Sequence, residues 1–379
     1  MKILVIGHAY IAPINREKWK VLSQKHPDSQ IKILIPKNWP ATLFKIEAGD
    51  LSKDNLQNCE FISLKTFKSG NEVLYGFSFF KLIKILKSFK PDIIHVEQGD
   101  NAFSYFQIIL LSKIFCRKAK FTFFTWVNWR AKRSLKYKLF WRFIEKFNLY
   151  YSDGAFVGND DAKVILREKK FNKPTNILLQ LGVNEKLFYP AKKINKIKKI
   201  GFIGRIVNEK GIYLLVDAFA KIADKFYDWN LVFIGDGQAK KDLINYVYSN
   251  KLEQRVEFRQ PVPHEKISLI LGEIEVLVLP SYDTSEWREQ FGHVLIEAMA
   301  CKTPVVGSTG GYISQVIENS GLVFKQKDIE GLVDCLTKIM GDEKLRKHLG
   351  DLGFERFKEN FSYEVIADKT YSFWRSLTK

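Results

Sequence analysis

Short apolar runs recur along the chain, and segments with helical periodicity follow most of them. Helices are predicted at residues 17–24 and 213–226. Strands are predicted at residues 3–7, 31–35, 93–96, 121–125, 155–157, 177–179, 199–204, 231–234, 256–258, 276–279 and 304–306. Strands that alternate with helices form parallel sheets through right-handed crossovers. We therefore expect an α/β protein with two doubly wound, Rossmann-like domains.

Domain boundaries are predicted from the length of 379 residues and from one change in composition. A chain of this length forms two domains more often than one or three. Residues 189–199 are rich in Lys and include Asn195 and Pro190, a composition that domain linkers often have. We predict a first domain at residues 1–190, a second at 191–362 and a final helix at 363–379.

The cellular compartment of the protein is predicted from its apolar runs and its cysteines. No run reaches 18 apolar residues, and residues 1–7 fit a buried strand better than a signal peptide. The 4 cysteines are widely spaced and form no CxxC pair. This pattern predicts a reducing, cytoplasmic setting and no structural metal.

Charge is concentrated in the first half of the chain. The formal net charge is +18, and residues 1–190 contain 32 basic and 16 acidic residues. Residues 101–150 contain 11 basic residues and a single acid, Glu145. Such asymmetry implies a polyanionic partner or a membrane surface. The charge alone is compatible with nucleic acid, anionic lipid or a phosphorylated acceptor as the partner.

A phosphate-binding loop is predicted at residues 201–211, between a strand and a helix. Gly204 permits a tight turn, and Arg205 and Lys210 can reach an anion held there. The loop is neither a GxGxxG fingerprint nor a Walker A sequence. A surface loop with two solvated cations is the alternative interpretation.

The strongest motif lies after the strand at 276–279. Glu289 lies in a loop, Gly292 opens a helix, and Glu297 lies about one turn inside it. Backbone N–H groups at residues 293–295 would face an anion. Carboxylates only accept hydrogen bonds, which suits the hydroxyls of a sugar or ribose. Charge compensation at the helix start for Glu289 and an ion pair for Glu297 are the alternatives.

Glycines also follow other predicted strands. Gly235 lies in a tight turn after residues 231–234, and Gly7 follows the first strand where backbone could approach a phosphate. His8 is a candidate acid, base or acceptor contact, although an isolated histidine is more often non-catalytic.

Taken together, these elements resemble the family 4 retaining glycosyltransferases, which have the GT-B fold. The matching motifs are Gly204-Arg205 with Lys210-Gly211, Gly235-Asp236-Gly237, Leu279-Pro280-Ser281, the E-x7-E pair Glu289 and Glu297, Gly310-Gly311, residues 181–190, Gly7, residues 91–95 and residues 151–154. The resemblance implies two domains that face each other across a cleft. It also implies a last helix that crosses back to the first domain.

The resemblance implies a role for each matching residue. Arg205 and Lys210 would hold the donor diphosphate, Glu289 the sugar hydroxyls and Glu297 the nucleotide ribose. Residues 260–262 would read the base. Further donor contacts would come from Gly7, Gly204, Gly235, Phe291, Gly292, His293, Val294 and Leu295.

The expected chemistry is glycosyl transfer from a nucleoside-diphosphate sugar. Arg205, Lys210 and helix-end amides would stabilise the leaving diphosphate, so neither a metal nor a cofactor is expected. The resemblance implies retention at the anomeric carbon. Arg205, Lys210 and Glu289 are the catalytic candidates, without a covalent nucleophile.

The sequence departs from the family pattern on the acceptor side. Trp126-Val127-Asn128 stands where the family commonly has a histidine, and Gln260 replaces a common glycine. The acceptor-side candidates are His8, Tyr10, Trp126 and Asn128.

The positive charge of the first half of the chain predicts the class of acceptor. Residues 79–87 and 132–151 read as basic amphipathic helices with aromatics, suited to an anionic membrane. We expect a peripheral enzyme on the inner face of the plasma membrane. It would move a hexose from a UDP- or GDP-sugar to a lipid-linked or membrane glycan, in polysaccharide or glycolipid synthesis.

Other functions remain as alternatives. A soluble acceptor or an inactive scaffold of the same fold is compatible with the motifs. A nucleic-acid binder would explain the charge but not the two-glutamate motif, so no nucleic acid is expected as a partner. The absence of GxGxxG argues against a nicotinamide-dependent oxidoreductase.

Overall fold

The computed structural model describes residues 1–40, 45–129, 141–190 and 197–378. The chain divides into two compact units: unit 1 contains Met1–Gly182 and Tyr363–Lys379, and unit 2 contains Val183–Ser362. The division therefore precedes the predicted boundary at residue 190. The reason is that Val183 pairs with Ser362, and its N–H donates to the carbonyl of Phe361 at 3.0 Å.

Unit 1 is built on a seven-stranded parallel sheet in the order β11-β10-β9-β8-β1-β2-β5. Its strands are β1 (Lys2–Ile6), β2 (Gln30–Pro36), β5 (Cys59–Leu64), β8 (Ile93–Val96), β9 (Lys120–Thr125), β10 (Gly154–Val157) and β11 (Thr175–Ile177). Two small antiparallel pairs are β3 (Asn38–Pro40) with β4 (Lys45–Glu47), and β6 (Thr66–Phe67) with β7 (Gly76–Phe77). The helices are α1 (Glu17–Lys25), α2 (Phe79–Phe89), α3 (Phe103–Phe115), α4 (Arg142–Tyr151), α5 (Asp160–Glu168) and α13 (Tyr363–Thr378).

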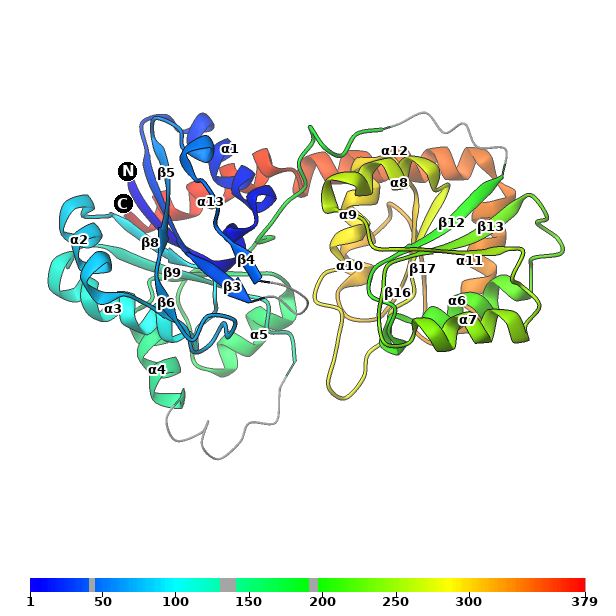
Figure 1. The fold of residues 1–379 in the computed structure, drawn as a ribbon, viewed down its shortest axis with the longest axis horizontal. Coiled ribbons are helices and arrows are strands. Elements are labelled where there is room, and N and C mark those ends of the chain that lie inside the picture. Colours follow the sequence, from blue (N-terminus) through cyan, green and yellow to red (C-terminus); the bar gives the residue numbers. More distant parts are fainter. Residues whose placement is uncertain (41–44, 130–140, 191–196, 379) are drawn as a thin grey trace. The chain divides into compact units, whose positions relative to one another are not determined.

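The last helix, α13, packs against α1 in unit 1 (Figure 1). The ring of Trp374 stacks on Trp19 at 6.0 Å between centroids, and both side chains are fully buried. The Trp374 indole N–H donates to the hydroxyl of Thr122 in β9 at 3.1 Å. A buried indole needs such a partner. The predicted return of the final helix to the first domain is therefore found.

Unit 2 contains a six-stranded parallel sheet in the order β14-β13-β12-β15-β16-β17 (Figure 1). Its strands are β12 (Lys198–Ile203), β13 (Trp229–Ile234), β14 (Val256–Arg259), β15 (Val276–Leu279), β16 (Val305–Ser308) and β17 (Leu322–Phe324). Its helices are α6 (Ile212–Ala220), α7 (Lys240–Ser249), α8 (Ile267–Glu273), α9 (His293–Ala300), α10 (Ile313–Ile317), α11 (Ile329–Gly341) and α12 (Glu343–Asn360).

Alternate residues of the unit 2 strands enter different cores, as the two-residue period of a strand requires. Phe202 and Phe233 pack with apolar residues of α6, α7 and α11. Val232 and Ile234 pack instead with Ile274, at the end of α8. Helices therefore cover both faces of this sheet, which explains why its strands read as continuous apolar runs in the sequence.

The predicted helix 213–226 is too long, since α6 ends at Ala220. Arg255 accounts for the early end, because its guanidinium donates to the carbonyls of Ala223, Phe226 and Trp229. These carbonyls are thereby held out of a continued helical ladder. The edge strands β5 and β17 were not predicted, and β11 lies two residues before its predicted position. Within the described residues, no helix is both long and apolar enough to cross a bilayer.

Candidate active site

The strand order of each unit predicts the edge of its sheet at which a ligand would bind. In unit 2, β12 lies between β13 and β15, and in unit 1, β1 lies between β2 and β8. The strand order reverses direction at β12 and at β1. In doubly wound sheets, ligands bind beyond the carboxyl ends of the strands at such a switch point. The loops after β12 and β15 in unit 2, and after β1 and β8 in unit 1, are therefore the candidate sites.

Three glycines bring the unit 2 loops into close contact. Gly204 has φ +153°, and a Cβ on Gly235 would lie 1.9 Å from the Gly204 carbonyl oxygen. Gly211 has φ +70°, and a Cβ there would lie 2.1 Å from the carbonyl oxygen of Pro280. Side chains at these positions would separate the loops after β12, β13 and β15. The predicted phosphate loop is thus held tightly against its neighbours.

Lys210 and Glu289, predicted to bind different parts of the donor, contact each other. The Lys210 ammonium lies 2.5 Å from the Glu289 carboxylate, which also accepts a hydrogen bond from the Ser281 hydroxyl at 3.2 Å. The Lys210 and Glu289 side chains are 14% and 11% exposed. Trp287 lies 5.0 Å from the Lys210 ammonium, so an aromatic face also contacts this cation. Arg205 from the same loop is exposed.

The start of α9 lies beside this ion pair in the sequence. Gly292 has φ +80° and forms the N-cap, so the first N–H groups of the helix have no carbonyl one turn before them. His293 and Val294 open the helix and are half-buried. Leu295 differs from the prediction, because its N–H donates to the Gly292 carbonyl at 2.9 Å and its side chain is fully buried. Phe291 packs against Phe361 at 5.7 Å.

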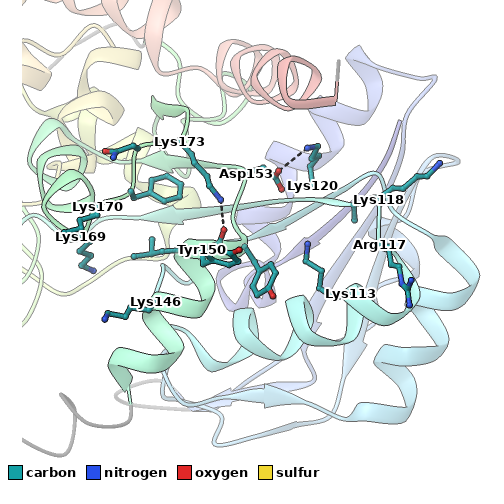
Figure 2. A pocket seen from close by; sticks show the side chains of 15 residues that line it. Lys113, Arg117, Lys118, Lys120, Lys146, Tyr150, Asp153, Lys169, Lys170 and Lys173 are labelled. Atoms are coloured by element: carbon teal, nitrogen blue, oxygen red, sulfur yellow. Dashed lines mark hydrogen bonds and ion pairs between the residues drawn. The ribbon is translucent and has the colours of Figure 1, made fainter.

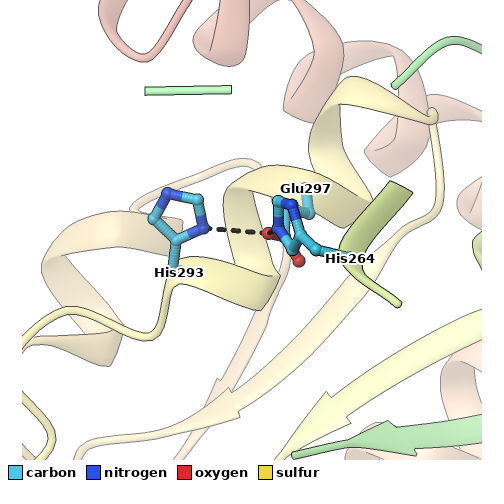
Figure 3. Close-up of side chains that lie close together, drawn as sticks. All are labelled: His264, His293 and Glu297. Atoms are coloured by element: carbon cyan, nitrogen blue, oxygen red, sulfur yellow. Dashed lines mark hydrogen bonds and ion pairs between the residues drawn. The ribbon is translucent and has the colours of Figure 1, made fainter. Parts of the chain in front are cut away.

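Glu297 lies at the centre of a cluster with two histidines (Figure 3). His264 Nε2 lies 2.5 Å and His293 Nδ1 lies 3.0 Å from the same oxygen, Oε1. Burial raises the pKa of Glu297, but the hydrogen bonds from the two histidines outweigh burial and hold that pKa at about 2. Glu297 is therefore a carboxylate at neutral pH. The three ligand atoms lie within 4.8 Å of one another, a grouping that could hold a metal ion.

His264 is the residue that the sequence analysis missed in this site. It lies five residues after β14, in the loop predicted to read the base. The sequence around His264 could not predict its contact with Glu297, because that contact depends on how the neighbouring loops fold. Gln260, in the same loop, is exposed and its side-chain oxygen lies 3.4 Å from the Lys240 ammonium.

The unit 1 residues divide into accessible and buried groups. His8 stacks on Trp39 at 4.6 Å, and it faces Gln98 at 3.2 Å and Glu72 at 3.3 Å. Tyr10 is fully buried and its hydroxyl donates to Glu97. Tyr10 therefore belongs to the core, which does not fit its predicted contact with an acceptor.

The other two acceptor-side candidates lie after β9. Trp126 is half-buried, and its indole N–H donates to the side-chain oxygen of Gln180 at 2.8 Å. Asn128 is buried. A Cβ on Gly7 would lie 2.6 Å from the Tyr10 ring, so this glycine makes room for a core aromatic as well as for backbone approach.

A buried ion network lies beneath this edge of unit 1. Lys18 Nζ lies 3.4 Å from Glu97 Oε1, and His95 Nε2 lies 3.5 Å from the same atom. Burial raises the pKa of Glu97, but the Lys18 ammonium and the His95 ring outweigh burial and hold that pKa at about 2. Burial lowers the pKa values of Lys18 and His95, whose interactions with Glu97 oppose that effect only in part.

A basic depression of about 810 Å³ lies at the other edge of the unit 1 sheet, where β9, β10 and β11 begin (Figure 2). Eight cations and one acid, Asp153, are among its lining residues. Lys120 pairs with Asp153 at 3.1 Å, and Lys173 donates to the carbonyl of Tyr150 at 2.6 Å. The cations are Lys113, Arg117, Lys118, Lys120, Lys146, Lys169, Lys170 and Lys173.

Comparison with known proteins shows similarity to glycosyltransferases. Residues 183–356 match the model of the family described as "Glycosyl transferases group 1". This match covers most of unit 2 and confirms the predicted resemblance to glycosyltransferases. The two parallel-sheet domains of the chain match solved GT-B glycosyltransferases, so the predicted fold class is also confirmed. One such structure is HepE from Anabaena in complex with UDP and glucose, with a TM-score of 0.69, 14% identity and coverage of 99% of this chain and 100% of HepE.

Two curated relatives align with this chain over only part of their length. The uncharacterized glycosyltransferase MJ1178 from Methanocaldococcus jannaschii is 29% identical over 233 residues, which cover 61% of each chain. The capsular polysaccharide biosynthesis glycosyltransferase CapM from Staphylococcus aureus is 29% identical over 192 residues, covering 50% of this chain and 48% of CapM. The aligned part thus spans about half to three fifths of these relatives.

Proposed function

We propose that the protein transfers a hexose from a nucleoside-diphosphate sugar to a lipid-linked or membrane glycan. The observation that carries this proposal is the contact of Lys210 with Glu289 in the loops at the switch point of unit 2, where Glu289 shortly precedes the start of α9. A cation, a helix start and a carboxylate together suit a diphosphate attached to a sugar. The UDP complex of HepE favours uridine over guanosine as the base.

The proposed chemistry relies on charge stabilisation of the leaving group. As the bond to the anomeric carbon breaks, negative charge develops on the β-phosphate. Arg205, Lys210 and the N–H groups at the start of α9 stabilise that charge, so the transfer needs no metal ion. Glu289 orients the sugar hydroxyls, and Glu297 accepts from the ribose. The family resemblance favours retention of configuration, with the acceptor attacking on the face that the diphosphate leaves.

Unit 1 supplies the proposed acceptor site and the membrane contact. The helices α2, α3 and α4 lie side by side in this unit (Figure 1). Lysines 81, 84 and 87 on α2 are exposed next to Phe80, which is 87% exposed. Tyr150 on α4 is 73% exposed beside the basic depression. Exposed aromatics with lysines suit an anionic leaflet, so we place the protein on the cytoplasmic face of the membrane. Residues 132–140 of the second predicted helix lie outside the described residues.

The donor site is tested by thermal shift with UDP, GDP and ADP. UDP should raise the melting temperature of the wild-type chain, because a ligand that binds only the folded state stabilises it. The shift should vanish in Lys210→Met and in Glu297→Gln. Lys221→Met is the matched control, since Lys221 lies on the surface of the same unit and pairs with Glu330. A wild-type chain that responds to none of the three nucleotides contradicts the donor site.

The membrane contact is tested by flotation with anionic and zwitterionic vesicles. The triple variant K81Q/K84Q/K87Q should lose about 3 kcal/mol of binding to anionic vesicles, or roughly 100-fold in partitioning, at about 1 kcal/mol per cation. The matched control removes three exposed lysines of unit 2, K338Q/K344Q/K347Q. Equal binding by the two triple variants, or no binding by the wild type, argues for a soluble acceptor.

A further inference from the structure

Two histidines and a glutamate from separate segments converge on one point of unit 2. His293 and Glu297 lie four residues apart on α9, so their side chains share one face of the helix. His264 approaches from the loop between β14 and α8. Figure 3 shows the three side chains close together, with His293 to one side of the carboxylate and the His264 ring overlapping it in this view. The family resemblance and the donor chemistry account for Glu297 but for neither imidazole.

The distances suit a small metal ion. Zinc binds imidazole nitrogen and carboxylate oxygen at about 2.0–2.2 Å, which places tetrahedral ligand atoms roughly 3.3 Å apart. Here the two nitrogens lie 2.5 Å and 3.0 Å from Glu297 Oε1, and all three ligand atoms lie within 4.8 Å of one another. Small rotations of the two rings would open the cluster enough for an ion.

The exposure of the cluster suits an ion that enters from solvent. The His264 and His293 side chains are 42% and 37% exposed, whereas Glu297 is 7% exposed. The buried carboxylate would form the floor, and the two rings would form the rim. Three protein ligands leave a fourth position open to solvent, as in zinc sites that exchange a ligand. Imidazole and carboxylate ligands together favour zinc and related transition metals over calcium or magnesium.

We propose that His264, His293 and Glu297 bind one divalent transition-metal ion, such as Zn²⁺, and that this ion excludes the donor nucleotide. The exclusion rests on the proposed function, in which Glu297 accepts from the ribose. A metal ion on Oε1 takes up a lone pair of the carboxylate, and its positive charge repels the hydroxyl hydrogens that the ribose would donate to Glu297. The metal is thus an inhibitor of the transferase and takes no part in sugar transfer. Metal binding itself does not depend on the proposed function.

Metal binding is tested with Zn²⁺ and Co²⁺ on the full chain after treatment with a chelator. Calorimetry should show one Zn²⁺ per chain. Co²⁺ should give the strong visible absorption bands of a tetrahedral site. His264→Ala and His293→Ala should each weaken Zn²⁺ binding by at least about tenfold, since even outer-shell changes cost that much. His348→Ala is the matched control, because His348 is exposed on α12 of the same unit.

The outcomes separate the two parts of the proposal. The metal site is overturned if the wild-type chain binds no Zn²⁺. It is also overturned if the His264→Ala variant binds Zn²⁺ as tightly as the His348→Ala variant does. The donor is then tested by UDP calorimetry at fixed free Zn²⁺, with Zn²⁺ binding to UDP itself measured separately. Zn²⁺ should weaken UDP binding to the wild type and leave that of His264→Ala unchanged. UDP affinity that does not respond to bound Zn²⁺ overturns the exclusion alone. Failure of UDP to bind the metal-free chain contradicts the proposed function and leaves the metal result standing.

Discussion

Replacing Lys18 with methionine removes a positive charge from the core of unit 1 and leaves its partner Glu97 in place. Both side chains are almost completely buried, and Lys18 Nζ lies 3.4 Å from Glu97 Oε1 and 2.8 Å from the carbonyl oxygen of Gln180. Burial lowers the pKa of His95, the other basic group at Glu97, so its ring is neutral at pH 7. Among the described residues, Lys18 therefore supplies the lasting positive charge at this carboxylate.

The size of the effect follows from the pKa of Glu97. A fall from 4.5 to about 2 corresponds to roughly 3 kcal/mol of stabilisation of the carboxylate in the folded chain. Removing one partner of a buried ion pair typically costs 3–5 kcal/mol, which is about the same size. We expect Lys18→Met to lower the free energy of unfolding by about 3–5 kcal/mol at pH 7. The double variant with Glu97→Gln should recover most of this loss, because no buried charge then remains.

The pH dependence gives a second readout. Because the folded pKa of Glu97 lies below the unfolded value, the wild type has this stabilisation above about pH 4.5 and loses it as the pH falls towards 2. In Lys18→Met, burial should raise the pKa of Glu97, so mild acid should reduce the deficit of the variant. Urea unfolding followed by the fluorescence of Trp19 and Trp374 measures both effects.

The control for this experiment lies on the same helix. Lys25 pairs with Asp368 at 2.6 Å, but its side chain is 33% exposed. Lys25→Met should therefore cost less than about 1 kcal/mol. A Lys18→Met variant as stable as Lys25→Met, or a double variant less stable than Lys18→Met, would refute the assignment of Lys18 as the compensating charge.

Two further predictions concern unit 2. Lys210→Met should weaken UDP binding by about 10–100-fold in calorimetry, because the diphosphate loses a cation and lies near a Glu289 carboxylate that has lost its Lys210 partner. A UDP affinity equal to that of Lys221→Met would contradict the phosphate role. Gly211→Ala should destabilise the chain by at least about 2 kcal/mol in urea unfolding, since its Cβ would lie 2.1 Å from a carbonyl oxygen. Gly49→Ala, with a similar φ of +64° and nothing within 4 Å, should lose about 1 kcal/mol from strain alone, and equal losses at both glycines would show that contact is unimportant.

The sequence predicted the central strands of both sheets because these are continuous apolar runs. The bounds of β8 and β15 agree with the prediction to the residue. The edge strand β5 alternates between buried and less buried positions and was missed. The end of α6 could not be predicted, because it is set by the Arg255 side chain from a distant loop. The local sequence pattern therefore predicts the central strands of the sheets, whereas the end of α6 depends on a side chain that is distant in the sequence.

The candidate site was predicted through its motif and not through its contacts. The E-x7-E spacing identifies Glu289 and Glu297 through the family resemblance, although Glu289 lies in the loop before α9 and Glu297 lies on the helix. The partners of these carboxylates come from other loops: Lys210 follows β12, and His264 follows β14. Nothing in the sequence indicates that Lys210 and Glu289 neutralise each other. Tyr10 failed as an acceptor candidate for a related reason, since only the packing shows that it points into the core.

The pairing of Lys210 with Glu289 has a consequence for how the donor binds. A diphosphate that attracts the Lys210 ammonium draws it away from the Glu289 carboxylate, which is 11% exposed and also accepts a hydrogen bond from the Ser281 hydroxyl. Sugar hydroxyls can replace the lost cation by donating to Glu289, whereas UDP without a sugar cannot. UDP-sugar should therefore bind the wild type more tightly than UDP, by about 1–3 kcal/mol.

Glu289→Gln should remove this difference, because a neutral amide leaves no charge to compensate. Calorimetry of UDP and of UDP-glucose with both proteins gives the four affinities that the comparison needs. Glu318→Gln, which alters an exposed carboxylate paired with Arg356 in the same unit, is the matched control and should keep the wild-type preference. If Glu289→Gln still prefers the sugar nucleotide to the wild-type extent, the sugar is held by other groups. Lys210 would then serve the diphosphate without any exchange of partners.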